Sequence, residues 1–239
     1  MRPLDLLAPL AEAPERSALV FDVDGTLAPI VPDPERASVP EATKAELRRL
    51  AARYLLVACI SGRAGTVARR LVDVEGVTYV GNHGLELDPR AQALAGTIAR
   101  FRDDVGLPVE DKILTLSYHY RDAPDEEAAR AELERVAERA RAEGLDARWG
   151  RKVLEVRPPL EADKGTAVRA LLAQAGASRG LYAGDDTTDL DAFAALAAAE
   201  LEHAVRIAVA SDEAPADLRE AADLAVSSPA ELARLLRSL

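Results

Sequence analysis

Residues 18–27 (ALVFDVDGTL) join a short apolar run to two carboxylates that are separated by one residue. The apolar run predicts a buried strand, and because side chains alternate along a strand, Asp22 and Asp24 point the same way at its end. Ligands bind at this end of the strands in open α/β sheets. Two close carboxylates repel each other unless a proton or a cation lies between them, and a hard cation such as magnesium suits oxygen ligands. The stretch therefore predicts a metal-dependent site, although Asp-Gly is also typical of a solvated turn.

The rest of the chain alternates short apolar runs with amphipathic patterns. Runs that predict buried strands cover residues 54–60, 77–81, 180–183 and 204–210. Patterns that predict helices cover residues 41–53, 65–72, 164–175, 189–199 and 229–239. Near-continuous apolar strands that alternate with helices indicate a parallel sheet covered on both faces. We therefore predict an α/β protein with a doubly wound, Rossmann-like parallel sheet.

A middle section departs from this pattern. Residues 112–120 (KILTLSYHY) and 147–156 (ARWGRKVLEV) alternate apolar and polar side chains, which predicts two strands that each have one open face. An apolar stripe over residues 129–140 predicts a helix between them. We expect an α+β cap domain at residues 101–160, inserted into a core that is formed by residues 1–100 and 161–239.

Three further motifs follow predicted strands or begin a predicted helix. Residues 181–189 (LYAGDDTTD) end a strand in an acidic cluster, which would also complement a helix dipole. Residues 60–63 (ISGR) offer a hydroxyl and backbone N–H groups to a phosphate, although Ser-Gly turns are common. Residues 163–165 (DKG) put Lys164 at a helix N-terminus against the dipole preference. An anion such as a phosphate or a carboxylate must compensate, unless the lysine simply lies in solvent.

Together, Asp22, Asp24, Ser61, Lys164 and Asp185 fit a phosphoryl-transfer site. A carboxylate nucleophile is already ionised at neutral pH and needs no base to activate it. Lys164 and a bound cation would neutralise the charge on the phosphate. A second carboxylate would protonate the leaving oxygen and then activate water against the aspartyl phosphate. At this point magnesium and manganese both stay open.

In these motifs and their order, the chain resembles the haloacid-dehalogenase-like phosphatases. Among those with an α/β cap, it is most similar to the trehalose-6-phosphate phosphatase family. That likeness rests on residues 81–86 (GNHGLE), 117–121 (SYHYR), 154–158 (LEVRP), 184–189 (GDDTTD) and 191–193 (DAF). Leu190 is a departure, because the related motif usually has an acidic residue there. We expect the change to be tolerated, since the ligating positions are intact.

The resemblance implies hydrolysis of trehalose 6-phosphate to trehalose and inorganic phosphate, with Asp22 as nucleophile and Asp24 as acid and base. Magnesium would be held by Asp22, the backbone carbonyl of Asp24, and Asp185, with Asp189 in support. The implied phosphate-binding residues are Ser61, Gly62 and Lys164. The implied sugar-binding residues are Arg63, His83, Glu110, Lys112, His119, Arg121, Glu155 and Arg157. Ordinary roles stay open for three of these: His83 as a turn residue, His119 as an exposed strand residue, and Glu155 as a cross-strand partner.

The bulk composition limits the possible partners. A net charge of −11 over 239 residues repels nucleic acids and anionic lipids. No apolar stretch approaches the ~20 residues of a membrane helix, and residues 1–10 predict a short opening helix or arm rather than a signal peptide. The single cysteine, Cys59, lies in an apolar run and is expected to be inert. We expect a monomeric cytoplasmic enzyme, without a fused glycosyltransferase domain, that takes a small-molecule sugar phosphate and has no nucleic-acid or membrane partner.

Other functions also fit parts of the pattern. A phosphatase for another ester, such as sucrose 6-phosphate or mannosyl-phosphoglycerate, or a sugar-phosphate mutase, would share the same core chemistry. A phosphoacceptor signalling module would use a strand-end aspartate, an acidic metal site, a hydroxyl and a lysine as well. Such a module needs about half this length, and its acidic pair precedes the acceptor aspartate, whereas Asp24 follows Asp22 here.

Overall fold

The computed structural model describes residues 3–33, 36–210 and 215–239, and the chain divides into two compact units. The first unit comprises residues 1–87 and 162–239, and the second comprises residues 88–161. The sequence predicts the first boundary at residue 100, whereas α4 (Pro89–Ala99) falls in the second unit. The physical reason is that Ile98 and Phe101 are fully buried in the hydrophobic core of that unit.

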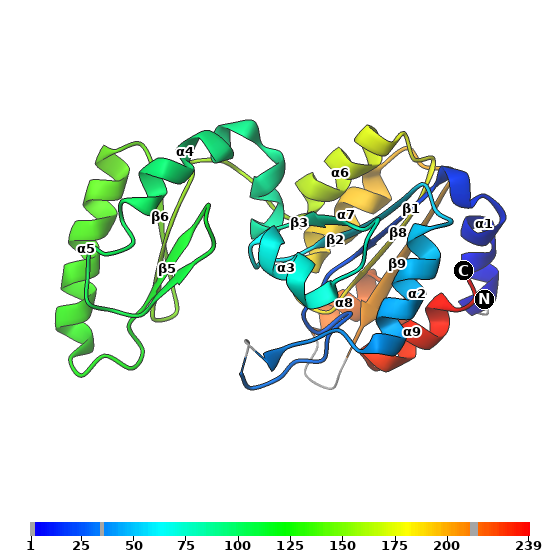
Figure 1. Cartoon of the computed structure of the whole chain (residues 1–239), viewed down its shortest axis with the longest axis horizontal. Coiled ribbons are helices and arrows are strands. Elements are labelled where there is room, and N and C mark those ends of the chain that lie inside the picture. The colour runs from blue at the N-terminus through cyan, green and yellow to red at the C-terminus, as the bar shows by residue number, and fades with distance from the viewer. Residues whose placement is uncertain (1–2, 34–35, 211–214) are drawn as a thin grey trace. The chain divides into compact units, whose positions relative to one another are not determined.

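Within the described residues, the first unit is built on a six-stranded sheet with the strand order β10-β9-β8-β1-β2-β3. All of these neighbours pair in parallel. The strands are β1 (Ser17–Phe21), β2 (Leu56–Ile60), β3 (Thr78–Val80), β8 (Arg179–Gly184), β9 (His203–Val209) and β10 (Leu224–Val226). Figure 1 shows this sheet with helices on both of its faces, as the sequence predicts.

Side chains along β1 alternate between two hydrophobic clusters, one on each face of the sheet. Leu19 and Phe21 belong to one cluster, and Ala18 and Val20 belong to the other. The first cluster takes in apolar residues of α1 (Pro3–Glu12), α2 (Glu41–Ala51), α3 (Gly65–Val72) and α9 (Pro229–Leu236), and the short helix η1 (Pro14–Arg16) leads into β1. The second takes in residues of α6 (Lys164–Ala175), α7 (Asp189–Ala198) and α8 (Ala216–Ala221).

Cys59 is fully buried in the first cluster, and burial raises the pKa of its thiol, so it is a core residue as expected.

The strand order has a reversal point between β1 and β8. The chain builds outward from β1 to β2 and β3, and then from β8 to β9 and β10 on the other side. In open α/β sheets the crevice at such a reversal is where ligands bind. Asp22 and Asp185 directly follow the two strands at this point, and the Asp22 backbone N–H donates to the Ala183 carbonyl at 2.9 Å. The strand order thus delivers the two carboxylates to the same edge.

Among the described residues of the first unit, four short elements have no counterpart in the sequence prediction. They are η1, β10, α8 and the helical turn η3 (Asn82–Leu87), which contains left-handed backbone at His83 and Gly84. Elements of three to six residues are too short for apolar periodicity to reveal them.

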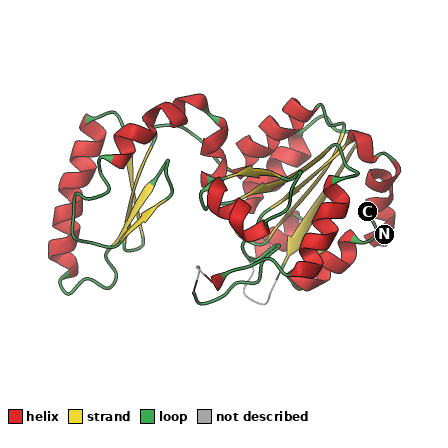
Figure 2. Cartoon of the chain, viewed as in Figure 1, coloured by secondary structure: helices red, strands yellow, loops and turns green. Residues whose placement is uncertain are grey.

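The second unit, whose residues 88–161 are all described, contains a four-stranded antiparallel sheet in the order β4-β5-β7-β6. Its strands are β4 (Val109–Asp111), β5 (Leu116–His119), β6 (Asp146–Gly150) and β7 (Val153–Arg157). The helix α5 (Glu126–Ala142) buries the predicted apolar stripe in a core that it shares with α4 and with one face of the sheet. Figure 2 distinguishes the strands and helices of each unit by colour.

The single strand predicted over residues 147–156 is wrong, because this stretch forms the two strands of a hairpin. Gly150 pairs with Val153 across a turn in which Lys152 has φ = 64°. The apolar alternation changes phase at this turn, since Ala147 and Leu154 both pack into the core of the unit. A phase change of this kind is the signal of a turn that a one-strand reading overlooks.

Among the described residues, no helix has both the length and the apolar character that crossing a bilayer would require.

A core substitution in the second unit tests its packing. Phe101→Ala should lower the free energy of unfolding of this unit by about 3–5 kcal/mol, because a fully buried ring is removed. Ile113→Ala is the control, since Ile113 is 48% exposed and should change stability little. Urea unfolding followed by circular dichroism measures both variants, and equal midpoints for the two would contradict the assigned core.

Candidate active site

Lys164 lies at the centre of the candidate site in the first unit. Its ammonium donates to Asp22 Oδ1 and to Asp189 Oδ1, both at 2.7 Å, and its side chain is only 4% exposed. The sequence suggests that an anion must compensate a lysine at this helix N-terminus. In the structure two buried carboxylates meet that requirement.

The start of α6 holds Lys164 in position. Asp163 precedes the helix and accepts from the Thr166 backbone N–H at 2.6 Å, while the Thr166 hydroxyl interacts with the Asp163 backbone N–H at 3.0 Å. This reciprocal capping box fixes the first turn of the helix. Because the capping box fixes the backbone of the first turn, it also fixes the position of Lys164, which directly follows Asp163.

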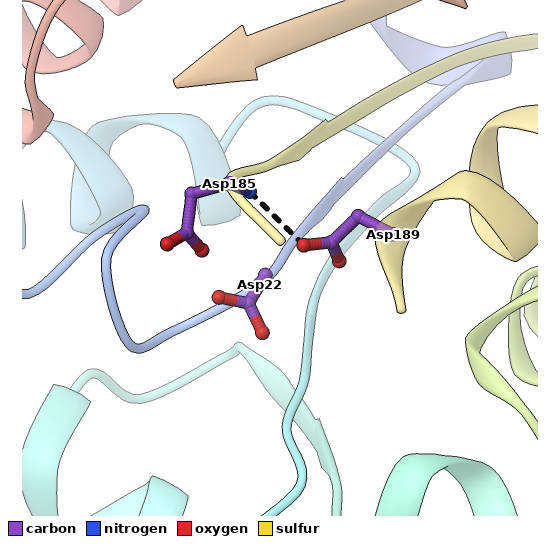
Figure 3. Close-up of side chains that lie close together, drawn as sticks. All are labelled: Asp22, Asp185 and Asp189. Carbon is purple, nitrogen blue, oxygen red and sulfur yellow. Dashed lines mark hydrogen bonds between the residues drawn. The ribbon is translucent and has the colours of Figure 1, made fainter. Parts of the chain in front are cut away.

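Three carboxylates converge beside Lys164. Asp22, Asp185 and Asp189 each offer an oxygen, and these oxygens all lie within 4.8 Å of one another. Figure 3 shows the three side chains meeting from the end of β1, the end of β8 and the start of α7. Thr26 donates its hydroxyl to Asp185 at 3.1 Å and orients that carboxylate. The donor set is all oxygen, which suits a hard cation.

Burial and mutual repulsion shift the pKa values of these groups. Burial raises the pKa of Asp22 well above its usual value, Lys164 opposes the shift, and Asp189 and Asp185 add to it. Burial, reinforced by Asp189, raises the pKa of Asp185 to about 6. Burial disfavours the charge of Lys164, but Asp22 and Asp189 outweigh it and raise the pKa of that ammonium.

The fully ionised cluster would carry two surplus negative charges, because three carboxylates face one ammonium. A divalent cation would balance this excess and favour the ionised form of Asp22. The residues present therefore fit a bound divalent cation.

Both oxygens of Asp189 are already in use within the protein. Oδ1 accepts from Lys164 and from the Tyr182 hydroxyl, the latter at 2.6 Å. Oδ2 accepts from the backbone N–H groups of Asp185 and Asp186, at 3.0 and 2.9 Å. A carboxylate oriented by so many donors organises the loop around it, which fits the supporting role that the resemblance implies.

Asp24 is turned toward Arg63. The guanidinium donates through Nε and Nη2 to the two Asp24 carboxylate oxygens, both at 2.8 Å, in a two-pronged pair. Asp24 follows β1 and Arg63 follows β2, so the structure pairs the predicted acid/base residue with a predicted sugar-binding residue.

Glycines allow the closest approaches around these strand ends. A Cβ on Gly25 would lie 1.9 Å from Asp185 Oδ2, and Gly25 has φ = +80°, so both contact and conformation require glycine. A Cβ on Gly62 would lie 2.6 Å from His83 Nε2. His83 therefore lies against the Ser61-Gly62 turn, within the first unit. Ser61 itself is buried and its hydroxyl accepts from the Arg63 backbone N–H at 3.1 Å.

Glu86 connects two of these loops. Its carboxylate accepts from the backbone N–H groups of Gly65 and Gly81, at 2.8 and 2.9 Å, and from the Asn82 side chain at 3.2 Å. The start of α3 and the turn after β3 are held together by this single side chain.

Five other predicted sugar-binding residues gather on the second unit. Across its sheet Glu110 pairs with Ser117, and Ser117 pairs with Glu155, so these side chains share one face. This face lies opposite the apolar residues that pack against α5. Because side chains alternate between the two faces along a strand, five predicted sugar-binding residues fall on this face: Glu110, Lys112, His119, Glu155 and Arg157. Arg121 lies beyond the end of β5 and is exposed.

The polar face carries two ion pairs and a contact between a carboxylate and a histidine ring. Glu110 lies 3.4 Å from Lys112 and 3.6 Å from His119, and Arg157 lies 3.6 Å from Glu155. Arg157 is buried, and its Nε has no hydrogen-bond partner within the described residues.

Sequence reasoning assigned no role to Thr26, Glu86 or Tyr182, although each hydrogen-bonds to the site or its loops. Thr26 lies in the motif at residues 18–27 and Glu86 in the motif at residues 81–86, so both belong to stretches that the sequence singles out. Tyr182 gave no separate signal, because it reads as one more apolar residue of a buried strand.

Comparison with solved structures identifies the class of fold. A haloacid dehalogenase-like hydrolase from Bacteroides thetaiotaomicron matches with a TM-score of 0.58 and 16% identity, covering 92% of this chain and 98% of that chain. A trehalose-6-phosphate phosphatase related protein matches with a TM-score of 0.68 and 23% identity, covering 92% of this chain and 95% of that chain. The predicted core with an additional α+β unit is therefore confirmed as a haloacid-dehalogenase-like fold.

Sequence comparison identifies the family. The trehalose-phosphatase family model matches residues 20–97 and 101–229, and the chain belongs to this family. A trehalose-phosphate phosphatase from Mycolicibacterium paratuberculosis is 36% identical over 248 residues, which cover 93% of this chain and 61% of that protein. The chain thus spans less than two thirds of the length of this relative.

A single-atom change tests the part that Asp189 plays in holding the site. Asp189→Asn should lower the free energy of unfolding by about 1–3 kcal/mol, because an amide NH2 would face hydrogen-bond donors in a buried place. Asp191→Asn, an exposed change in the same helical turn, removes the same charge from the helix N-terminus and controls for the dipole. Chemical denaturation compares the two, and an equal loss in both would mean that the buried contacts contribute nothing.

Proposed function

We propose that the chain is a magnesium-dependent phosphatase that hydrolyses trehalose 6-phosphate through an aspartyl phosphate on Asp22. The observation that carries the proposal is the buried contact between Asp22 and Lys164 at the reversal point of the sheet, beside two more carboxylates. Membership of the trehalose-phosphatase family supports the choice of substrate.

Each step of the proposed reaction is assigned to a side chain of the first unit. Asp22 Oδ attacks phosphorus, and the bond from phosphorus to the sugar oxygen breaks. Asp24 gives its proton to that oxygen and later takes one from the water that attacks the phosphoenzyme. Lys164, the Ser61 hydroxyl and the backbone N–H groups at Gly62 stabilise the charge on the phosphate oxygens.

Magnesium would be held by Asp22, Asp185 and the backbone carbonyl of Asp24, with Asp189 orienting the loop around them. When bound, the cation supplies electrostatic stabilisation of the phosphate and balances the crowded carboxylates. The charge excess of the cluster supports a divalent ion.

The polar face of the second unit is the proposed sugar-binding surface. Its donors and acceptors, from Lys112 and His119 to Glu155 and Arg157, suit the hydroxyl groups of a disaccharide. Arg121 of the second unit, and separately Arg63 and His83 of the first unit, remain proposed sugar-binding residues. We retain the expectation of a monomeric cytoplasmic enzyme, and the net charge of −11 supports the absence of a nucleic-acid partner.

A substrate panel tests the function. The purified protein should release phosphate from trehalose 6-phosphate far faster than from sucrose 6-phosphate, glucose 6-phosphate or mannosyl-phosphoglycerate, and a chelator should stop the reaction. Preference for another ester would keep the core chemistry and refute the sugar assignment. Release from none of them would refute the phosphatase proposal, and a stable phosphoprotein would then favour the signalling module.

Replacing the nucleophile tests the mechanism. Asp22→Asn should reduce phosphate release by about 10³-fold or more, because an amide cannot form the aspartyl phosphate. The amide oxygen can still accept from Lys164, so circular dichroism should show an intact fold. Asp24→Asn should slow both formation and hydrolysis of the phosphoenzyme, and rapid turnover by either variant would remove its residue from the assigned role.

Magnesium affinity should depend on pH because Asp185 has a raised pKa. In the metal-free protein this group keeps its proton up to about pH 6, whereas in the unfolded chain it loses it near its usual value of 3.8. The metal-free fold therefore loses stability as pH rises between these values. Magnesium must displace the proton, so calorimetry should find binding about tenfold tighter at about pH 7 than at about pH 5. Affinity that is equal at the two pH values would contradict the assignment of Asp185 as a ligand.

A further inference from the structure

Tyr182 is a buried titratable residue to which the proposed mechanism gives no task. It belongs to β8, its side chain is fully buried, and its ring packs edge-on against Phe193 at a centroid distance of 6.0 Å. Packing alone would be served equally well by phenylalanine. The hydroxyl, however, points to the site and donates to Asp189 Oδ1 at 2.6 Å.

The Tyr182 hydroxyl acts on the oxygen that also holds Lys164. Asp189 Oδ1 accepts from both groups, and the same ammonium reaches Asp22 Oδ1 at 2.7 Å. Burial raises the pKa of Tyr182, so its hydroxyl keeps its proton and remains a donor. A hydrogen bond to a carboxylate oxygen reduces the negative charge that this oxygen presents to a second donor.

We propose that Tyr182 is a positioning residue that keeps Lys164 shared between Asp189 and the nucleophile Asp22. Without the hydroxyl, Asp189 Oδ1 would attract the ammonium more strongly, and Lys164 would move away from Asp22 and from the phosphate that Asp22 attacks. The chain of contacts runs from Tyr182 through Asp189 and Lys164 to Asp22, all within the first unit. The proposal rests on the proposed phosphatase function, because it assigns Lys164 to the reacting phosphate.

A pair of tyrosine-to-phenylalanine variants tests this role. Tyr182→Phe removes one oxygen and leaves the packing against Phe193. Tyr54→Phe is the matched control, since Tyr54 is also buried and its hydroxyl donates to the backbone oxygen of Leu239 at 3.0 Å. Both variants lose one buried hydrogen bond, so their thermal midpoints should fall by similar amounts.

Kinetics separate positioning from stability. With magnesium and trehalose 6-phosphate, Tyr182→Phe should lower kcat by about tenfold or more and leave KM within about twofold. Tyr54→Phe should leave both constants within about twofold of the wild type. A wild-type kcat in Tyr182→Phe, or an equal loss of kcat in Tyr54→Phe, would overturn the proposal.

A crystal structure of Tyr182→Phe provides a second readout that does not need activity. The distance from Lys164 Nζ to Asp22 Oδ1, which is 2.7 Å in the native protein, should increase while the contact with Asp189 remains. If the wild type hydrolyses no sugar phosphate, the proposed function fails, and the distance from Lys164 to Asp22 alone then tests the positioning role of Tyr182. An unmoved Lys164 overturns the positioning role.

Discussion

The buried ammonium of Lys164 is the interaction on which the first unit depends. A charged side chain that is 4% exposed is tolerated only if partners replace its lost hydration. Asp22, after the end of β1, and Asp189, at the start of α7, do so. Three elements that are far apart in sequence must therefore arrive together. The same requirement explains why the start of α6 is held by a capping box and why Asp189 is oriented by four donors.

The charge balance of this cluster connects folding with chemistry. In addition to burial, the neighbouring carboxylate of Asp189 raises the pKa values of both Asp22 and Asp185, and Asp185 also raises the pKa of Asp22. The metal-free fold would be more stable without this repulsion between carboxylates. Repulsion of this kind is characteristic of a functional site, because a bound cation would relieve it and favour the ionised form of Asp22.

The sequence predicts the positions of the core carboxylates better than the contacts that support them. The strand-end positions of Asp22 and Asp185 follow from buried apolar runs, because parallel strands deliver their ends to one edge. The hairpin at residues 147–156 was missed because a phase shift of one residue is easily read as continuous alternation. Tyr182 was missed for another reason: burial is visible in a pattern, but the direction of a hydroxyl depends on Asp189, which approaches from the next helix.

The two units also differ in how much sequence reasoning can say about specificity. Buried partners fix the carboxylates of the first unit, and glycines such as Gly25 permit their close approach. The proposed phosphate chemistry needs groups fixed this closely. The polar face of the second unit instead presents ion pairs of 3.4–3.6 Å. The contact between Glu110 and His119 is about half exposed and can exchange partners at low cost, whereas Arg157 is buried. For the proposed function, the reaction centre is therefore easier to predict from motifs than the sugar, which must be identified by measurement.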